Sequence, residues 1–276
     1  MSAKAKRIFK KQKSIKMNKT YKLTLITLSL FIFACTTLKI ASKPTVYLIG
    51  DSTVKNGRDN GAGGLWGWGH FIGDLFDTKK AAFKNHALGG TSTKTFRTLG
   101  LWDSVLVKIK TGDYVIMQFG HNDSSPLDDS ARARGTIKGN GDESQEIYNP
   151  ILKKKELVHS YGWYIRQFVS ETKAKGGIPI VCSLIPRNSW SNGKVDRSEY
   201  VEWARAAAIQ ENAYYIDLNK LIANEYNKAG QAKVNETYFG PKDATHTIEE
   251  GAKFNAQKVV DGIKEINGLK LNKYIK

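Results

Sequence analysis

An acid and a hydroxyl stand directly after the apolar run at residues 45–49, in the sequence Gly50-Asp51-Ser52. A buried strand that ends in this way presents its last side chains at the rim of a sheet, where α/β proteins place their sites. Ser52 is therefore a candidate nucleophile, although a serine hydroxyl is inert near neutral pH and needs a neighbouring base. An ordinary turn after a strand could have the same residues, so a base and oxyanion donors must decide between the two interpretations.

The base would have to be one of five histidines. His159 falls within a predicted helix and His70 near the start of another, which favours structural roles for both. His86, His121 and His246 fall near predicted strand ends or loops and remain as candidates. The chain has no HExxH motif and no clustered Cys/His spacing, so we expect no metal site, and the chemistry requires no cofactor.

His246 has the most informative surroundings of the three. Asp243, three residues earlier, could accept a hydrogen bond from one imidazole nitrogen and leave the other to face Ser52, as a general base requires. Thr247 and Glu250 form a capping-box pattern, which predicts a helix that begins immediately after His246. The positive end of that helix disfavours an imidazolium and the carboxylate favours it, which suits a base that works near neutral pH. Alternatively, Asp243 and His246 only shape the loop before the helix.

Donors for an oxyanion are predicted at two further strand ends. Gly89 and Gly90 follow the second predicted strand, and glycine lets a backbone N–H approach a ligand closely. Asn122 follows the third predicted strand and would place its amide at the same rim. The N–H of Ser52, the N–H of Gly90 and the Asn122 side chain would then form an oxyanion hole for acyl transfer. The glycine pair is also compatible with an ordinary tight turn.

These segments resemble, in order, the four blocks of the SGNH (GDSL-type) hydrolases. The matching residues are Gly50-Asp51-Ser52, Gly90, Gly120-His121-Asn122-Asp123 and Asp243-Ala244-Thr245-His246. Other residues are similar to the rhamnogalacturonan acetylesterase branch of that family, namely Thr53-Val54, Gly67-Trp68-Gly69, His121 in the third block and Thr247 before the final helix. The resemblance extends from about Thr45 to the last helix.

This resemblance implies a three-layer α/β/α, flavodoxin-like fold. It also implies Ser52 as nucleophile, His246 as base, Asp243 as the residue that orients the base, and Ser52, Gly90 and Asn122 as the oxyanion hole. The chain has no G-x-S-x-G elbow, which argues against an α/β-hydrolase.

Alternating strands and helices must position these groups. Strand-like apolar runs lie at residues 45–49, 82–87, 114–119, 178–185 and 214–218. Apolar stripes with helical spacing lie at residues 96–109, 157–169 and 248–263. This alternation predicts right-handed crossovers and a mostly five-stranded parallel sheet that is covered on both faces. We expect a single domain over residues 43–276.

Residues 124–155 interrupt the alternation, because they are polar and show no clear apolar period. A connection this long in a compact domain is usually functional or disordered, and this one follows a strand end. We therefore favour a substrate-facing loop over a solvated insertion. Basic residues that could face uronate carboxylates, or form only a solvated surface, are Arg132, Arg134, Lys138, Arg187 and Lys242. The predicted substrate contacts are His121, Arg134 and Arg187, and we expect Trp66 and Trp68 to pack in the core rather than on sugar rings.

The formal charge of +17 would suggest a nucleic-acid partner, but much of it lies near the N-terminus. Residues 1–34 hold nine basic residues and no acid, and without them the charge falls from +17 to +8. No dense basic tract remains, so no nucleic-acid partner is expected. The apolar run at residues 23–34 is short for a membrane span and typical of an export signal.

We expect the leader, residues 1–42, to be cleaved either before Cys35, which would then carry a lipid anchor, or near Ser42, which would release a soluble protein. The protein would be periplasmic or at the cell surface, and it would meet the membrane only through that anchor. Cys182 lies in an apolar run and is expected in the core, with no disulfide framework.

The predicted function is a serine esterase that removes O-acetyl groups from a polysaccharide, and the resemblance favours pectic rhamnogalacturonan. Another SGNH esterase, acting on acetylated xylan or on a lipid ester, would keep the same three residues. A non-catalytic carbohydrate-binding lipoprotein would bind pectin without hydrolysing esters. A glycoside hydrolase or lyase would need paired carboxylates or a basic abstraction site, for which Asp51 and Asp123 are the nearest acids. His121 is the rival to His246 as the base.

Overall fold

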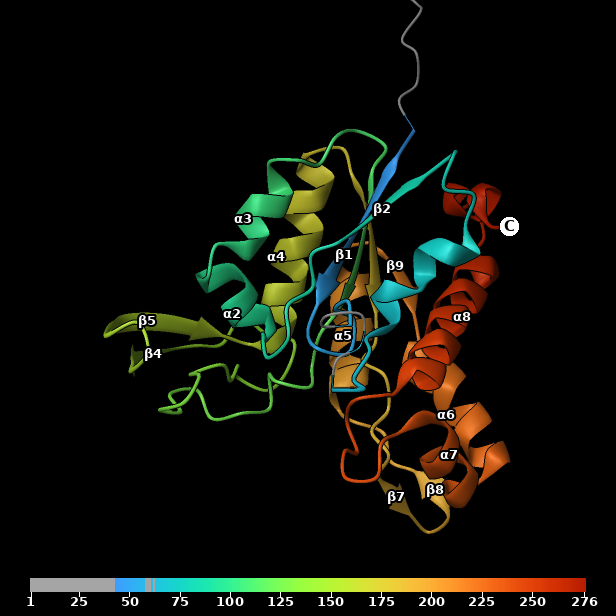
Figure 1. Cartoon of the computed structure of the whole chain (residues 1–276). Coiled ribbons are helices and arrows are strands. Elements are labelled where there is room, and N and C mark those ends of the chain that lie inside the picture. The colour runs from blue at the N-terminus through green and yellow to red at the C-terminus, as the bar shows by residue number, and fades with distance from the viewer. Residues whose placement is uncertain (1–42, 58–60, 62) are drawn as a thin grey trace, which may run out of the picture. The chain divides into compact units, whose positions relative to one another are not determined.

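The computed structural model describes residues 43–276, apart from residues 58–60 and residue 62 (Figure 1). The predicted leader at residues 1–42, its cleavage sites and the lipid anchor at Cys35 lie outside the described residues and stay predictions. Of the helices in the described part, none is both long enough and apolar enough to cross a membrane.

Five parallel strands form the central sheet, in the order β2-β1-β3-β6-β9. Their bounds are Thr45–Gly50 for β1, Ala82–Asn85 for β2, Tyr114–Gln118 for β3, Ile178–Cys182 for β6 and Tyr214–Ile216 for β9. The predicted five-stranded parallel sheet is confirmed. The chain moves outward from β1 to β2 and then returns to the other side of β1 for β3, so the strand order reverses between β1 and β3.

Seven α-helices lie in the described part of the chain. They are α2 (Thr93–Thr98), α3 (Leu101–Leu106), α4 (Tyr161–Ala174), α5 (Tyr200–Gln210), α6 (Leu218–Ala229), α7 (Gln231–Tyr238) and α8 (Glu249–Glu265). Short 3-10 turns lie at Trp68–His70, Ile72–Leu75 and Lys270–Tyr274.

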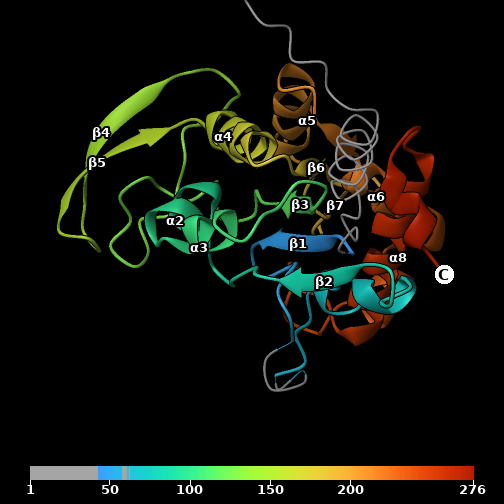
Figure 2. The same ribbon diagram turned by 90° about the horizontal axis from the view of Figure 1, so that it is seen from above.

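The helices cover both faces of the sheet, because its strands are apolar on both faces. Alternate residues of β1 enter opposite cores, with Val46 and Leu48 in one and Tyr47 and Ile49 in the other. Helices α6, α7 and α8 complete the first core, and α2, α3, α4 and α5 complete the second (Figures 1 and 2). The three-layer α/β/α fold is confirmed, and Cys182 is buried in the first core as predicted.

The apolar stripe predicted at residues 157–169 does not form one helix. Helix α4 begins at Tyr161, after Ser160 accepts a hydrogen bond at 3.0 Å from the backbone N–H of Trp163. The preceding residues form β5 (Lys154–His159), so His159 lies at a strand end and not within a helix. The prediction was wrong there because two apolar strand residues match the helical spacing by coincidence, and one of them, Leu157, is exposed.

The stripe at residues 96–109 is also divided, into α2 and α3. Gly100 separates them with a φ of +70°, a left-handed conformation that favours glycine. The break turns Leu99 outward, so this residue is exposed although it fits the predicted apolar stripe.

The segment at residues 124–155 has more regular structure than predicted. It contains β4 (Ser144–Asn149) and the start of β5, which pair in antiparallel register as a two-stranded hairpin. Figures 1 and 2 show this hairpin beside α2, projecting away from the central sheet. A second, smaller hairpin joins β7 (Trp190–Ser191) to β8 (Lys194–Val195).

Candidate active site

Ser52 lies in the turn that follows β1, next to the reversal of strand order. Ligands of open α/β sheets bind beyond the carboxyl ends of the strands at such a switch point. The backbone carbonyl of Asp51 closes the turn by accepting from the N–H groups of Val54 and Lys55 at 3.2 and 3.1 Å. Asp51 and Thr53 are buried while Ser52 is partly exposed, so the turn presents the Ser52 side chain to a cavity.

Buried hydrogen bonds support this turn from within the protein. The Thr53 hydroxyl donates to Oδ1 of Asp51 and accepts from the Gln118 side-chain amide, both at 2.7 Å. Gln118 accepts in turn from the indole N–H of Trp68 at 2.8 Å. Trp68 is fully buried, so it packs in the core as predicted. The supporting roles of Thr53 and Gln118 were missed, and the only signal for them was a polar residue at the end of an apolar strand.

His246 lies between Ser52 and Asp243. Its Nε2 is 2.7 Å from Oγ of Ser52, and its Nδ1 is 2.7 Å from Oδ2 of Asp243. A carboxylate only accepts hydrogen bonds, so Nδ1 carries the proton when the imidazole is neutral, and Nε2 accepts from the serine hydroxyl. This is the arrangement of a nucleophile, a general base and a residue that orients the base.

Asp243 is held as a carboxylate by its own loop. Its Oδ1 accepts from the backbone N–H groups of Thr245 at 2.8 Å and His246 at 2.9 Å. Burial alone would raise the pKa of Asp243, but these N–H groups and the imidazole outweigh it and hold the pKa below its usual range. Asp243 therefore stays ionised beside the imidazole near neutral pH.

The predicted capping box at Thr247 and Glu250 does not form. The Thr247 hydroxyl donates to the backbone carbonyl of Trp66 at 3.0 Å, and the Trp66 N–H donates to the Thr247 carbonyl at 2.9 Å. With the Thr247 side chain occupied, Ile248 becomes the N-cap residue and α8 begins at Glu249. This bridge fixes the loop that carries His246 against the segment that follows the Ser52 turn.

The three predicted oxyanion donors line the same cavity as His246. Gly90 has a φ of +82°, and a Cβ at this position would lie 2.6 Å from a guanidinium nitrogen of Arg132. Within the described part of the chain, the N–H groups of Ser52 and Gly90 donate to no other group. The Asn122 amide donates one hydrogen to the Thr91 carbonyl at 2.8 Å, and its second hydrogen remains for a ligand.

The cavity that contains Ser52 is strongly cationic. It has a volume of about 400 Å³ and is lined by Ser52, Lys55, Gly89, Gly90, His121, Asn122, Arg132, Arg134, Arg187, Thr245 and His246. The predicted contacts His121, Arg134 and Arg187 are therefore all brought to it, whereas Lys138 and Lys242 are not among its lining residues. None of these lining residues is acidic, so a ligand in the cavity contacts four cationic side chains and no carboxylate of the lining.

His121 differs from His246 in its surroundings. It is buried, and neither ring nitrogen has a hydrogen-bond partner among the described residues. Burial lowers the pKa of His121 to about 4, so its imidazole is neutral near pH 7. The serine hydroxyl contacts His246 and not this ring. His121 can offer one donor and one acceptor to a ligand in the cavity.

The remaining histidines lie elsewhere. His70 packs edge-on against Trp66, and His159 stacks on Trp163 with ring centroids 3.8 Å apart. His86 is packed near the ring of Tyr47, and burial lowers its pKa. In the described ranges, no group of three or more His, Cys, Asp or Glu side chains is arranged to hold a metal ion.

Asp51 and Asp123 do not form a pair of carboxylates that faces a substrate. Both are fully buried, and neither lines the cavity. Asp123 accepts from the backbone N–H and the hydroxyl of Thr93, and burial raises its pKa to about 7. These acids instead fix the loops that follow β1 and β3, which contradicts the glycosidase interpretation.

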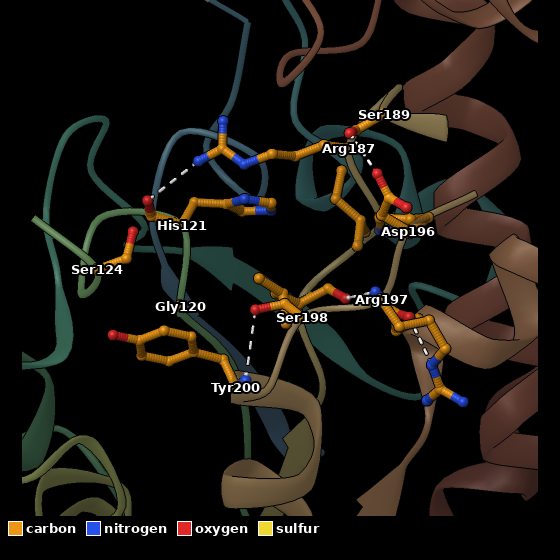
Figure 3. Close-up of a pocket in the computed structure, with 13 residues that line it drawn as sticks. Gly120, His121, Ser124, Arg187, Ser189, Asp196, Arg197, Ser198 and Tyr200 are labelled. Carbon is orange, nitrogen blue, oxygen red and sulfur yellow. Dashed lines mark hydrogen bonds between the residues drawn. The ribbon is translucent and has the colours of Figure 1, made fainter. Parts of the chain in front are cut away.

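A second cavity, of about 200 Å³, adjoins the first and shares His121 and Arg187 with it. Figure 3 shows these two side chains along one side of the cavity and Tyr200 along another. Arg187 donates to the His121 carbonyl at 3.2 Å and to the hydroxyl of Thr245. It therefore joins the loop after β3 to the loop that carries His246.

Comparison with known proteins is consistent with this arrangement. Residues 48–253 match the model of the GDSL-like lipase/acylhydrolase family. A rhamnogalacturonan acetylesterase from Emericella nidulans is 30% identical over 247 residues, which cover 88% of this chain and 94% of that protein. A probable rhamnogalacturonan acetylesterase from Bacillus subtilis is 31% identical over 83% of this chain and 96% of its own length.

Solved structures are similar in fold. The YxiM protein of Bacillus subtilis superposes with a TM-score of 0.65 at 26% identity, and the match covers 81% of this chain and 56% of that longer protein. A mutant of an acetyl-xylooligosaccharide esterase from Geobacillus superposes with a TM-score of 0.56 at 15% identity, over 84% of this chain and 99% of that protein. At that identity the second likeness concerns the fold alone.

Proposed function

Because the chain belongs to the GDSL-like lipase/acylhydrolase family of carboxylic ester hydrolases, we propose that it is a serine esterase that removes O-acetyl groups from pectic rhamnogalacturonan. One observation carries the proposal. The contact from Ser52 through His246 to Asp243 opens into a cavity with four cations and no acidic lining residue. The first part of that observation supports ester hydrolysis, and the second supports an anionic substrate.

In the first step, Oγ of Ser52 attacks the acetyl carbonyl carbon while Nε2 of His246 takes the hydroxyl proton. The negative charge that develops on the carbonyl oxygen is stabilised by the N–H groups of Ser52 and Gly90 and by the Asn122 amide. The tetrahedral intermediate then collapses. The bond to the sugar oxygen breaks, and that oxygen receives the proton from the imidazolium.

In the second step, water attacks the acetyl-serine and gives its proton to His246. The same donors stabilise the second tetrahedral intermediate. Its collapse returns the proton to Oγ of Ser52 and releases acetate. Asp243 keeps the imidazole in the required tautomer and stabilises the imidazolium in both steps.

The charge of the cavity suits the sugar that carries the acetyl group and not the ester itself. An acetyl ester has no charge, so Lys55, Arg132, Arg134 and Arg187 have no partner in the ester itself. A uronate carboxylate on the acetylated sugar or its neighbour would supply an anionic partner, and guanidinium groups bind carboxylates in bidentate geometry. A neutral xylan chain would offer these cations no negatively charged group.

The experiment measures acetate release from three substrates: acetylated rhamnogalacturonan oligosaccharides, the same oligosaccharides after reduction of the uronate carboxyls, and acetylated xylo-oligosaccharides. We expect kcat/KM to fall at least roughly tenfold on carboxyl reduction, because charged hydrogen bonds are lost. Added salt should lower kcat/KM for the uronate substrate more than for the other two. Equal rates on reduced and unreduced oligosaccharides, or faster release from xylan, would contradict the proposal.

A further inference from the structure

The hairpin formed by β4 and β5 has two faces of different character. In its antiparallel register, Ile147 pairs with Glu156 and Gln145 with Val158, and these residues share one face. On that face Ile147 and Val158 are buried, so it attaches the hairpin to the domain. The opposite face, which we call the outer face, has Ser144, Glu146, Tyr148, Lys155, Leu157 and His159.

Large apolar groups are exposed on the outer face. Tyr148 is 61% exposed and Leu157 is 54% exposed, and they are two of the seven large hydrophobic residues that are exposed in the described part of the chain. Since Tyr148 pairs with Lys155, Leu157 is its diagonal neighbour on the partner strand, within reach of an aromatic side chain. Exposed apolar residues scattered singly are ordinary, whereas adjacent ones indicate an interaction surface.

An aromatic pair extends this row of apolar groups. His159 lies two residues beyond Leu157 on the same face, and its ring stacks on that of Trp163 in α4, with centroids 3.8 Å apart and planes at 11°. Both residues are partly exposed. Residues 155–159 of an extended strand span about 13 Å. The outer face therefore offers flat apolar surfaces over a length greater than one sugar ring.

Polar contacts behind the outer face fix the hairpin in place. Asn149, which is buried, accepts from the N–H groups of Ile151 and Leu152 at 2.9 and 3.0 Å and so shapes the turn. Its side-chain amide donates to Glu156 at 2.6 Å. Glu156 is also paired with Lys94 of α2 at 3.2 Å, and the Lys94 side chain is only 1% exposed. The outer face is therefore preformed, which lowers the entropic cost of binding.

Three consecutive lysines give this end of the hairpin a positive charge. Lys153 and Lys154 are exposed and form no ion pair with another described residue. Lys155 pairs with Glu146 across the outer face at 2.8 Å, and both side chains are exposed, so the pair is weak and open to exchange with another anion. A ligand that suits this face has flat rings and negative charges.

The hairpin lies beside the catalytic cavity. Ile151 and Leu152 of its turn line a cavity of about 310 Å³ together with Gly89 and Gly90, and these two glycines also line the cavity that contains Ser52. Figures 1 and 2 show the hairpin projecting outward beside α2. A polymer held on the hairpin therefore stays close to the serine.

We propose that the outer face of the hairpin is a second, non-catalytic binding site for an anionic polysaccharide, an inference that rests on the proposed function for the identity of the chain. Sugar rings stack on Tyr148 and on the His159–Trp163 pair, and Leu157 packs between them. The lysines at the end of the hairpin bind uronate carboxylates. Binding here raises the local concentration of ester groups near Ser52. A second copy of this chain would add its own lysines to the same surface, which like charges disfavour.

The test measures binding separately from hydrolysis. Ser52→Ala protein, which cannot turn over an ester, is run by affinity electrophoresis through gels that contain polygalacturonate or neutral xylan. Tyr148→Ala and Leu157→Ser are each added to this protein. Ile209→Ser is the matched control for Leu157→Ser, because Ile209 is 58% exposed and lies on α5, outside the hairpin.

We expect polygalacturonate to retard the Ser52→Ala protein and Tyr148→Ala to weaken that binding about tenfold. Leu157→Ser should weaken it less, Ile209→Ser should not change it, and added salt should weaken it in all of them. With Ser52 restored, Tyr148→Ala should raise KM for acetate release from the acetylated polymer and leave kcat unchanged. Hydrolysis of p-nitrophenyl acetate should not change, and circular dichroism checks that each variant is folded.

Three outcomes would overturn the inference. Equal retardation of the proteins with Tyr148→Ala and Ile209→Ser would mean that the outer face binds no polysaccharide, although the proposed function stands. Equal retardation by xylan would remove the requirement for an anionic chain. A wild-type dimer in sedimentation velocity that Tyr148→Ala converts to a monomer would assign the face to a second copy. Failure of the proposed function is distinct, because acetate release from acetylated rhamnogalacturonan would be absent while Tyr148→Ala still weakened the binding of polygalacturonate.

Discussion

Two histidines line the same cavity, and their surroundings give them opposite properties. His246, on the loop before α8, has hydrogen-bond partners on both ring nitrogens, one of them Ser52 and the other Asp243. His121, on the loop after β3, is buried with both nitrogens unpartnered among the described residues. The first ring can exchange a proton with the serine, while the second is a neutral group of low pKa.

The contrast shows that the hydrogen-bond partners of an imidazole, and not only its place in a cavity, decide whether it can act as a base. A carboxylate beside Nδ1 stabilises the imidazolium that forms in the transition state. Burial without a carboxylate partner has the reverse effect, because it penalises the charged form.

The largest effect separates the two histidines directly. His246→Ala should lower kcat for p-nitrophenyl acetate by about 10⁴-fold or more, because the serine loses its base. His121→Ala should lower it far less, on the order of tenfold, through a ligand contact or loop packing. Initial rates on both variants, with folding checked by circular dichroism, decide the matter. An inactive His121→Ala beside an active His246→Ala would reverse the assignment.

The next effect concerns the orientation of His246. Asp243→Asn should lower kcat by about a thousandfold or more while the fold is retained, because an amide no longer requires the proton on Nδ1. The loss should appear in kcat more than in KM, since the imidazolium forms only in the transition state. A loss confined to KM would mean that Asp243 acts on substrate binding.

The third prediction concerns how the stability of the protein depends on pH through His121. The pKa of His121 is about 4 in the folded protein and about 6.5 in the unfolded chain. Its contribution to the free energy of unfolding is therefore complete above pH 6.5 and is lost as the pH falls towards 4. Relative to His121→Phe, the wild type should lose about 3 kcal/mol of unfolding free energy over that interval. Urea unfolding of both proteins at several pH values measures the difference.

Asp123 has a raised pKa, so its effect on the pH dependence of stability is the reverse of that of His121. Its contribution to the free energy of unfolding is lost as the pH rises through about 7. It is present in both proteins, so its effect cancels to a first approximation in the comparison. Parallel stability curves for the wild type and His121→Phe would show that His121 is not buried in its neutral form.

The smallest effect concerns Arg187, which joins the two histidine loops. Arg187→Lys keeps the charge, but a single ammonium group cannot reproduce the forked contacts with the His121 carbonyl and the Thr245 hydroxyl. We expect roughly a fivefold rise in KM for an acetylated uronate oligosaccharide, corresponding to about 1 kcal/mol. The change with p-nitrophenyl acetate should be smaller, and equal changes on both substrates would remove Arg187 from substrate recognition.

Much of the site follows from local sequence. The three-residue spacing of Asp243 and His246 allows the acid to reach the ring within one loop, and Gly50-Asp51-Ser52 marks a strand end. Parallel strands have their carboxyl ends at one edge of the sheet, which brings Ser52 near Asn122. Buried strands and the larger helices could be predicted because their apolar residues repeat with a regular period.

Other features depend on contacts that no local pattern encodes. The hairpin of β4 and β5 is largely polar and lies beside α2, where Lys94 and Glu156, far apart in the sequence, form a buried pair. The hydrogen bond from Trp68 to Gln118 likewise joins residues 50 positions apart. The capping-box prediction was wrong for the same reason, since the Thr247 hydroxyl donates to the carbonyl of Trp66, which is distant in the sequence.

We propose that Ser52 forms an acetyl ester during turnover, with His246 as its base. The most direct test is peptide mass spectrometry of enzyme that has been quenched in acid during hydrolysis of p-nitrophenyl acetate. We expect one acetylated peptide, modified at Ser52, in the wild type and no modification of that peptide in Ser52→Ala or His246→Ala. Acetyl transfer to another residue, or full activity of Ser52→Ala, would contradict the account.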